Sequence, residues 1–203
     1  MSFEIKFSKK SIPYQKAMLF LRKRVEEVKN GENKELIWVL EHPKTYTAGV
    51  SFKQNEIIDR KIKIIKTNRG GKITLHNPGQ KIVYFVINLN NRKKDIRKLI
   101  SCIETSIMEF LKSLKIVAKK DKKNIGIWVR EKKIAAIGLR VSRWIAFHGF
   151  SINVSNNLKE YLKIVPCGLD NTKITSIFTE MNIIPENFEK KLVNILVRNI
   201  NKI

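Results

Sequence analysis

Cysteine, proline and glycine are scarce in this chain, with two, five and nine residues among 203. Two cysteines cannot build the disulfide framework that is typical of small secreted proteins. The chain has no C-x-x-C pair, and no two of its three histidines have the spacing of metal ligands, so we predict no metal site. No apolar run is long enough to span a membrane, and the N-terminus has no secretory signal. We therefore expect a cytoplasmic protein that does not enter a membrane.

Acidic residues are also few, because 18 Asp and Glu accompany 41 Lys and Arg, which gives a net charge of +23. Such an imbalance is typical of proteins with an acidic partner, such as nucleic acid, a membrane surface or an acidic protein. The basic residues are nevertheless scattered from end to end, in a chain rich in Ile, Lys and Asn. The charge is therefore equally well explained by lysines that fill surface positions throughout the chain, without an acidic partner.

The hydrophobic pattern predicts one α+β domain over residues 1–203. Helices are expected at 12–29, with Ser11 as N-cap, at 94–115, and from Pro185 onward. Strands are expected at 36–40, 62–67, 81–89, 124–129, 133–141 and 143–154. Segment 41–49 is expected to be a loop. Strands and helices do not alternate regularly, which favours α+β over a doubly wound sheet.

Glycine pairs and turn residues surround several candidate site residues. In "RGGKITLH", residues 69–76, the paired glycines would let the backbone approach a ligand closely, although a tight turn explains them equally well. The sequence is neither a P-loop nor a dinucleotide-binding fingerprint. His42, His76 and His148 each lie in or beside a segment that contains Gly or Pro. Taken singly, each histidine is weak evidence for a functional site, because a lone histidine is usually structural.

The two cysteines lie in different settings. Cys102 falls within the helix predicted at 94–115 and is expected in the core. Cys167 lies between Pro166 and Gly168, where its flank is bare and a carbonyl carbon could approach. A thiol is nucleophilic only as thiolate, so such a role needs a nearby cation, imidazole or N–H group. Strict alternation along 133–141 would place Lys133 on one face with Ala135 and Ile137, but nothing in the pattern selects this lysine from the other cations.

Taken together, these stretches resemble the lipoyl(octanoyl) transferase family. The resemblance covers most of the chain in one order: "EHPKTYTAG" at 41–49, "RGGKITLHNPGQKIVYFVINL" at 69–89, "KIAAIGLRV" at 133–141, "FHGFSINV" at 147–154 and "PCGLDNTKITSI" at 166–177. Members of this family usually have His-Gly-Pro-Gly-Gln where this chain has Asn77 as the second residue. If that position needs a positive φ, asparagine is among the least costly replacements for glycine.

The resemblance implies a site residue by residue. Cys167 would form the thioester, Lys133 would lower its pKa, and backbone N–H groups at 167–168 with His76 would stabilise the oxyanion. The acyl chain would be bound by Arg69, Gly70, Gly71, Lys72, Ile73, Thr74, Leu75 and His76, by Ala136, Ile137 and Gly138, and by Gly149, Phe150 and Ser151.

The resemblance also implies the fold and the reaction. The fold would be that of the biotin and lipoate protein ligase catalytic domain, a mixed sheet backed by helices. The octanoyl group would pass from octanoyl-acyl carrier protein to Cys167 and then to a lysine of lipoyl domains of 2-oxoacid dehydrogenase complexes and related proteins, the first step of endogenous protein lipoylation. No cofactor would be needed, because the thioester is already activated.

Two alternatives remain at this point. An ATP-dependent lipoate ligase has the same fold but makes an acyl-adenylate and has no use for a nucleophilic cysteine. A basic nucleic-acid-binding protein would suit the charge, but the cations do not gather with aromatic residues as a stacking platform requires.

Overall fold

A computed structural model describes residues 2–121, 124–165 and 173–203. The strands are β1 (Phe3–Phe7), β2 (Glu35–Leu40), β3 (Thr45–Ala48), β4 (Ile64–Lys66), β5 (Ile73–His76), β6 (Gln80–Asn88), β7 (Lys119–Lys120), β8 (Ile127–Val129), β9 (Lys132–Ser142) and β10 (Ile145–Asn153). The helices are α1 (Tyr14–Asn30), α2 (Ile96–Lys112), α3 (Ile177–Met181) and α4 (Phe188–Ile200), with 3₁₀ turns η1 (Gln54–Glu56), η2 (Leu89–Asn91) and η3 (Leu158–Lys163).

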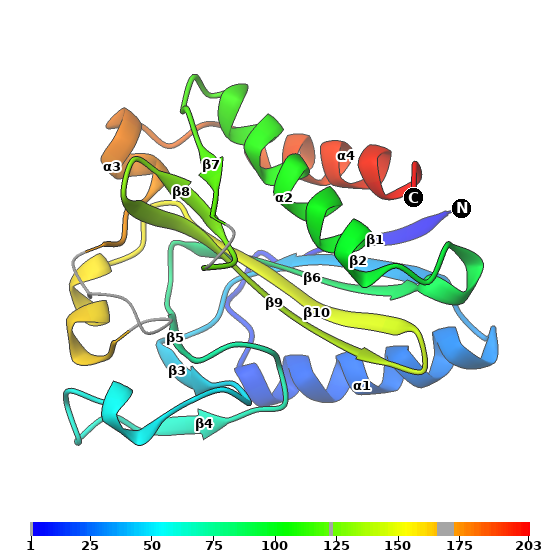
Figure 1. Cartoon of the computed structure of the whole chain (residues 1–203), viewed down its shortest axis with the longest axis horizontal. Coiled ribbons are helices and arrows are strands. Elements are labelled where there is room, and N and C mark those ends of the chain that lie inside the picture. The colour runs from blue at the N-terminus through cyan, green and yellow to red at the C-terminus, as the bar shows by residue number, and fades with distance from the viewer. Residues whose placement is uncertain (1, 122–123, 166–172) are drawn as a thin grey trace.

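The main sheet has seven strands in the order β1-β2-β6-β10-β9-β8-β7. It is mixed, because β1 runs parallel to β2 while the other neighbours are antiparallel. A second sheet has the order β4-β3-β5 and lies beside the start of α1 (Figure 1). The predicted α+β class and the mixed sheet with flanking helices are confirmed.

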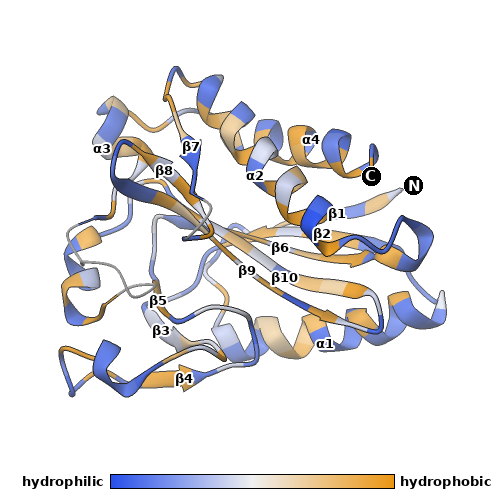
Figure 2. Cartoon of the chain, viewed as in Figure 1, coloured by the Kyte–Doolittle hydropathy of each residue, from blue (hydrophilic) through white to orange (hydrophobic). Residues whose placement is uncertain are grey.

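The helices cover the two faces of the main sheet (Figure 1). One face of β2, β6 and β10 packs on α1 through residues such as Leu21, Trp38 and Phe147. The other face packs on α2 and α4 through a larger cluster that includes Phe85, Phe110 and Leu196. Figure 2 shows apolar residues concentrated along the central strands, whereas α1 presents both apolar and polar residues. This amphipathic pattern is what a helix covering a sheet requires.

The sequence predicted that helices α1 and α2 exist, but it placed their ends inaccurately. Pro13, not the predicted Ser11, is the N-cap of α1, and no side chain caps this end. Pro13 has φ −54 and ψ 135, and it has no N–H to leave unpaired. At α2, Asp95 is the N-cap, and its carboxylate accepts a hydrogen bond from the Lys98 N–H at 2.9 Å. Both helices are shorter than their predicted ranges.

The second sheet corrects one loop prediction and adds a strand after the paired glycines. Strand β3 lies within the segment 41–49 that was expected to be a loop, and β5 lies within the stretch that a turn could also explain. The two strands pair antiparallel from Thr45 opposite His76 to Ala48 opposite Ile73. Short strands of this kind are stabilised by a partner distant in sequence, which a local pattern does not reveal.

Strand β9 contains an irregularity that changes which way Lys133 faces. In the pairing with β8, Ile127 lies opposite Ala135 while Trp128 lies opposite Lys133, so Ile134 is the extra residue of a β-bulge. Ile134 and Ala135 both join the cluster under α2 and α4. Lys133 instead lines a cavity with Ala136 and Gly138. The predicted placement of Lys133 on one face with Ala135 was therefore wrong, whereas Ile137 does line the same cavity.

Among the described residues, no helix is both long and apolar enough to cross a membrane.

Candidate active site

A cavity of about 750 Å³ lies between strands β9 and β10 and the loop that precedes β5. Most of the sequence-predicted acyl-binding residues line it: Arg69, Gly70, Gly71, Lys72, Thr74, His76, Ala136, Ile137, Gly138, Gly149, Phe150 and Ser151, together with Lys133. Ile73 and Leu75 do not. They alternate with Thr74 and His76 along β5 and pack with Tyr46, Tyr161 and Ile164 in the core of the second sheet.

Arg69 braces the glycine loop over the cavity. Its Nη2 donates to the carbonyl oxygens of Thr47 and Lys72, at 2.8 Å each, and its Nη1 donates to the Gly70 carbonyl oxygen at 2.9 Å. A Cβ at Gly49 would lie 2.3 Å from the Gly71 carbonyl oxygen, so only glycine permits this close approach. The Gly70 N–H donates to the Leu139 carbonyl oxygen at 3.0 Å and ties the loop to β9. The Arg69 guanidinium thus fixes the glycine loop by donating hydrogen bonds to backbone carbonyl oxygens.

Lys133 is buried, with 4% of its surface exposed. Its Nζ lies 5.2 Å from the centroid of the Trp128 ring, a cation–π contact, and among the described residues it has no ion-pair partner. The Trp128 Nε1–H donates to the Asn124 carbonyl oxygen at 3.1 Å, which fixes the indole. A Cβ at Gly126 would lie 2.6 Å from Lys133 Cε, so glycine leaves room for the lysine stem. A buried amine beside a cavity, with no ion-pair partner among residues 2–121, 124–165 and 173–203, is a candidate for proton transfer or charge stabilisation.

The backbone of Lys133 also holds the segment that follows the predicted nucleophile. The Lys133 N–H donates to the Lys173 carbonyl oxygen at 2.8 Å, and the Thr175 N–H donates to the Lys133 carbonyl oxygen at 3.0 Å. Asn153 Nδ2 in turn donates to the Thr175 carbonyl oxygen at 3.0 Å. Cys167 itself lies outside the described residues, as does the rest of 166–172. The chain therefore re-enters the described structure at the Lys133 end of the cavity.

Cys102 behaves as predicted for a core residue. It is buried on α2 within the cluster shared with α4. Burial raises the pKa of its thiol to about 11, which leaves little thiolate near neutral pH.

The three histidines, far apart in sequence, lie together with Tyr14 and Tyr84. The ring centroids of His42 and His76 are 5.6 Å apart, and Tyr84 lies 5.7 Å from His42 and 6.4 Å from His148. Burial lowers the pKa of His42 to about 4, of His76 to about 3 and of His148 to about 4. All three rings are therefore neutral at pH 7. Among the described residues, no three His, Cys, Asp or Glu side chains form a metal-binding group.

Hydrogen bonds fix the tautomers of two of these histidines. His42 Nδ1–H donates to the Ile12 carbonyl oxygen, so its Nε2 accepts from the Tyr84 hydroxyl at 2.9 Å. His76 Nδ1–H donates to Gln80 Oε1 at 2.8 Å. The Nε2 atom of neutral His76 is consequently an acceptor, so this ring cannot donate to an oxyanion, the role that the resemblance suggested.

Asn77 does not need a left-handed backbone. The residue of this turn with positive φ is Gly79, at +85°, and Asn77 is not among the non-glycine residues with positive φ. Its side chain is instead buried in hydrogen bonds, since Asn77 Nδ2 donates to the Asn157 carbonyl oxygen and Asn77 Oδ1 accepts from Asn156 Nδ2, each at 3.0 Å. Asparagine thus connects this turn to residues 156–157.

The fold is that of the lipoate and biotin protein ligases. The chain superposes on a lipoate protein ligase from Thermoplasma acidophilum with bound lipoic acid at a TM-score of 0.75 and 12% identity, covering 98% of this chain and 86% of the other. For biotin protein ligase from Aquifex aeolicus the TM-score is 0.59 at 15% identity, covering 99% and 70%. At these identities the likeness concerns the fold alone.

The sequence comparisons define the family more narrowly. The profile of the lipoyl protein ligase A/B catalytic domain matches residues 13–197. An octanoyltransferase from Ehrlichia chaffeensis is 42% identical over 180 residues, which is 86% of this chain and 84% of the relative. The chain therefore belongs to the octanoyltransferase family, and it is an acyltransferase.

Proposed function

We propose that the enzyme transfers an octanoyl group from octanoyl-acyl carrier protein to a lysine of lipoyl domains through a thioester on Cys167. One observation carries this proposal: the buried Lys133 amine lies at one end of the cavity and its backbone binds the segment that leaves Cys167. Such an arrangement suits a cysteine nucleophile, because a nearby ammonium stabilises the thiolate.

In the first half-reaction the Cys167 thiolate attacks the carbonyl carbon of the donor thioester. A C–S bond to Cys167 forms, the bond to the carrier's sulfur breaks, and Lys133 gives a proton to the departing thiolate. The products are octanoyl-Cys167, the free carrier thiol and a neutral Lys133 amine. Backbone N–H groups at 167–168 would stabilise the oxyanion. Neutral His76 would take no part as a donor.

In the second half-reaction the amine of the acceptor lysine attacks octanoyl-Cys167. Lys133, now neutral, accepts the proton that this nitrogen loses as the amide forms. Cys167 leaves as thiolate beside the restored Lys133 ammonium, so the enzyme returns to its starting state. Neither half-reaction consumes ATP, because the thioester already supplies the driving force for amide formation.

The partners follow from the same proposal. The acceptor class is supported by the shared fold, since one structural neighbour is a bipartite lipoate protein ligase from Thermoplasma acidophilum described with its E2 lipoyl domain. The net charge of +23 suits an acidic carrier as donor. We place the reaction in the cytoplasm, where such a carrier and acceptor would meet.

Intact-protein mass spectrometry tests the proposal. The wild-type enzyme mixed with octanoyl-acyl carrier protein should gain one octanoyl group without ATP and lose it when a lipoyl domain is added. Cys167→Ala should show neither gain nor transfer, whereas Cys102→Ala should retain both. An enzyme that modifies the lipoyl domain only with ATP and free octanoate would instead be a ligase.

A further inference from the structure

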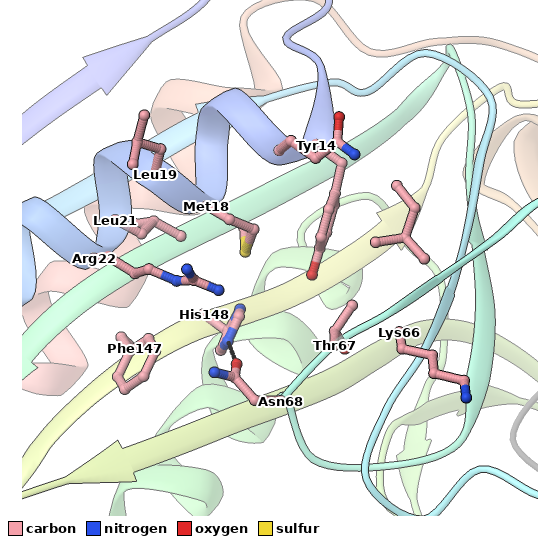
Figure 3. A pocket seen from close by; sticks show the side chains of 12 residues that line it. Tyr14, Met18, Leu19, Leu21, Arg22, Lys66, Thr67, Asn68, Phe147 and His148 are labelled. Carbon is pink, nitrogen blue, oxygen red and sulfur yellow. Dashed lines mark hydrogen bonds between the residues drawn. The ribbon is translucent and has the colours of Figure 1, made fainter.

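A second cavity of about 410 Å³ is lined by side chains of α1, of the segment after β4 and of β10 (Figure 3). It opens between α1, the segment that follows β4, and the beginning of β10. Tyr14 and His148 line both cavities. These two side chains therefore form a partition between the second cavity and the first one, which is called the acyl cavity below because the proposed acyl-binding residues line it.

Aromatic contacts hold the Tyr14 side of this partition. The residue is 5% exposed, and its ring lies 5.3 Å from the His42 ring in an edge contact and 6.2 Å from the His76 ring in a stacked one, centroid to centroid. Burial raises the pKa of the Tyr14 hydroxyl, which therefore stays neutral. A buried ring packed on two others is a fixed wall of the acyl cavity.

His148 forms the other side. Its φ of +67° interrupts the alternation of β10, and both Phe147 and His148 line the second cavity, with their rings stacked at 5.0 Å. His148 Nε2–H donates to Asn68 Oδ1 at 3.3 Å, and its buried Nδ1 has no hydrogen-bond partner among the described residues. The His148 ring is thus held by ring stacking and by one hydrogen bond.

The second cavity has a largely hydrocarbon wall. Figure 3 shows Met18, Leu19 and Leu21 of α1 on one side of it and Phe147 on another. The charged side chains that line it, Arg22 and Lys66, are exposed. A cavity of this size with an apolar body suits methylene groups.

The direction of a bound acyl chain follows from the proposed function, on which this inference rests. A chain attached at Cys167 begins near Lys133. Farther along β9 from Lys133, Gly138 pairs with Gly149, the neighbour of His148. A chain that extends along β9 therefore points its methyl end toward Tyr14 and His148.

We propose that Tyr14 and His148 set the length limit of the acyl group, and that the second cavity is a latent subsite for longer chains. Acyl chains of ten to fourteen carbons would reach it only when the Tyr14 ring is removed or displaced. Tyr14 is thus a specificity-determining residue, and it acts by steric exclusion of the methyl end.

Acyl transfer from carrier thioesters of eight and twelve carbons to a lipoyl domain tests this. Tyr14→Ala should raise the ratio of kcat/KM for dodecanoyl over octanoyl at least tenfold, because each added methylene withdrawn from water is worth about fourfold. Tyr14→Phe, which keeps the ring, should leave the ratio near that of the wild type. Adding Met18→Trp to Tyr14→Ala should fill the second cavity and return the ratio toward the wild-type value.

The outcomes separate two failures. If the wild type does not transfer octanoyl groups at all, the proposed function fails. If octanoyl transfer is intact but Tyr14→Ala keeps the wild-type ratio, the partition does not set chain length. A gain that persists in Tyr14→Ala/Met18→Trp would overturn the latent subsite. Should Tyr14→Ala fail to fold by thermal denaturation, Tyr14→Leu serves the same comparison.

Discussion

Lys133 and Trp128 are direct partners across β8 and β9, with the lysine Nζ 5.2 Å from the centroid of the indole ring. The bulge at Ile134 allows this pairing, because it turns Lys133 to the cavity face while Ala135 stays in the core. An aromatic face stabilises a cation without neutralising it. The contact therefore holds the Lys133 amine in place at the cavity.

Lys133→Met should keep the stem of the side chain and remove its charge. Alkylation of Cys167 by iodoacetamide should then require a higher pH, since an opposite charge within about 4–6 Å favours the thiolate. Transfer to the acceptor lysine should fall by about 10²- to 10⁴-fold, the usual contribution of a positioned proton acceptor. Lys133→Arg should restore part of the alkylation but little transfer, because guanidinium does not give up a proton near neutral pH. An alkylation profile unchanged in Lys133→Met would refute the pairing.

Gly126→Ala should displace Lys133 without changing its chemistry. The added Cβ would lie 2.6 Å from Lys133 Cε and 2.7 Å from the Ala135 carbonyl oxygen, at a backbone φ of +142°. We expect lower acyl transfer and a loss of about 1–3 kcal/mol in the free energy of unfolding. Gly31→Ala is the matched control, since its φ is +77° and nothing lies within 4 Å of the added Cβ. Gly31→Ala should lower the free energy of unfolding and leave acyl transfer intact. If both variants lowered transfer equally, backbone strain rather than displacement of Lys133 would explain the loss.

The carrier's apparent affinity should depend on salt if the charge of +23 recruits it. Raising the salt concentration from 50 to 500 mM shortens the Debye length from roughly 14 to 4 Å. KM for octanoyl-acyl carrier protein should therefore rise several-fold, while KM for a small octanoyl thioester without the protein carrier should change little. A KM for the carrier that does not respond to salt would identify the lysines as compositional.

Acidification should destabilise the fold through its three buried histidines. Their folded-state pKa values of about 4, 3 and 4 lie below the ordinary value of 6.5. The unfolded chain therefore binds protons first, so the stabilisation is complete above pH 6.5 and is lost as pH falls toward 4. Between pH 6.5 and 5 the free energy of unfolding should fall by up to about 1.4 kcal/mol per pH unit for each histidine. Imidazole NMR signals that titrate near pH 6.5 in the folded protein would contradict this.

Sequence reasoning located the central elements because their signals are local. The helix face of α2 follows from periodicity, the strands β2, β6 and β10 follow from short apolar, β-rich runs, and the glycine loop and its resemblance pointed to the cavity. The strand β3 and the bulge at Ile134 escaped prediction, since pairing partners distant in sequence determine both. Ile73 and Leu75 were assigned to the site with their whole segment, although alternation along β5 turns them into the core.

The sequence by itself determined the α+β class and the family, because these depend on composition, order and short motifs, and it supplied the hypothesis that Cys167 and Lys133 react. Only the tertiary structure decided which groups meet. It buried Lys133 against Trp128, gathered His42, His76 and His148 with two tyrosines, and placed Tyr14 between two cavities. The physical reason is that such contacts join strands, helices and loops far apart along the chain, and packing rather than local preference selects their geometry.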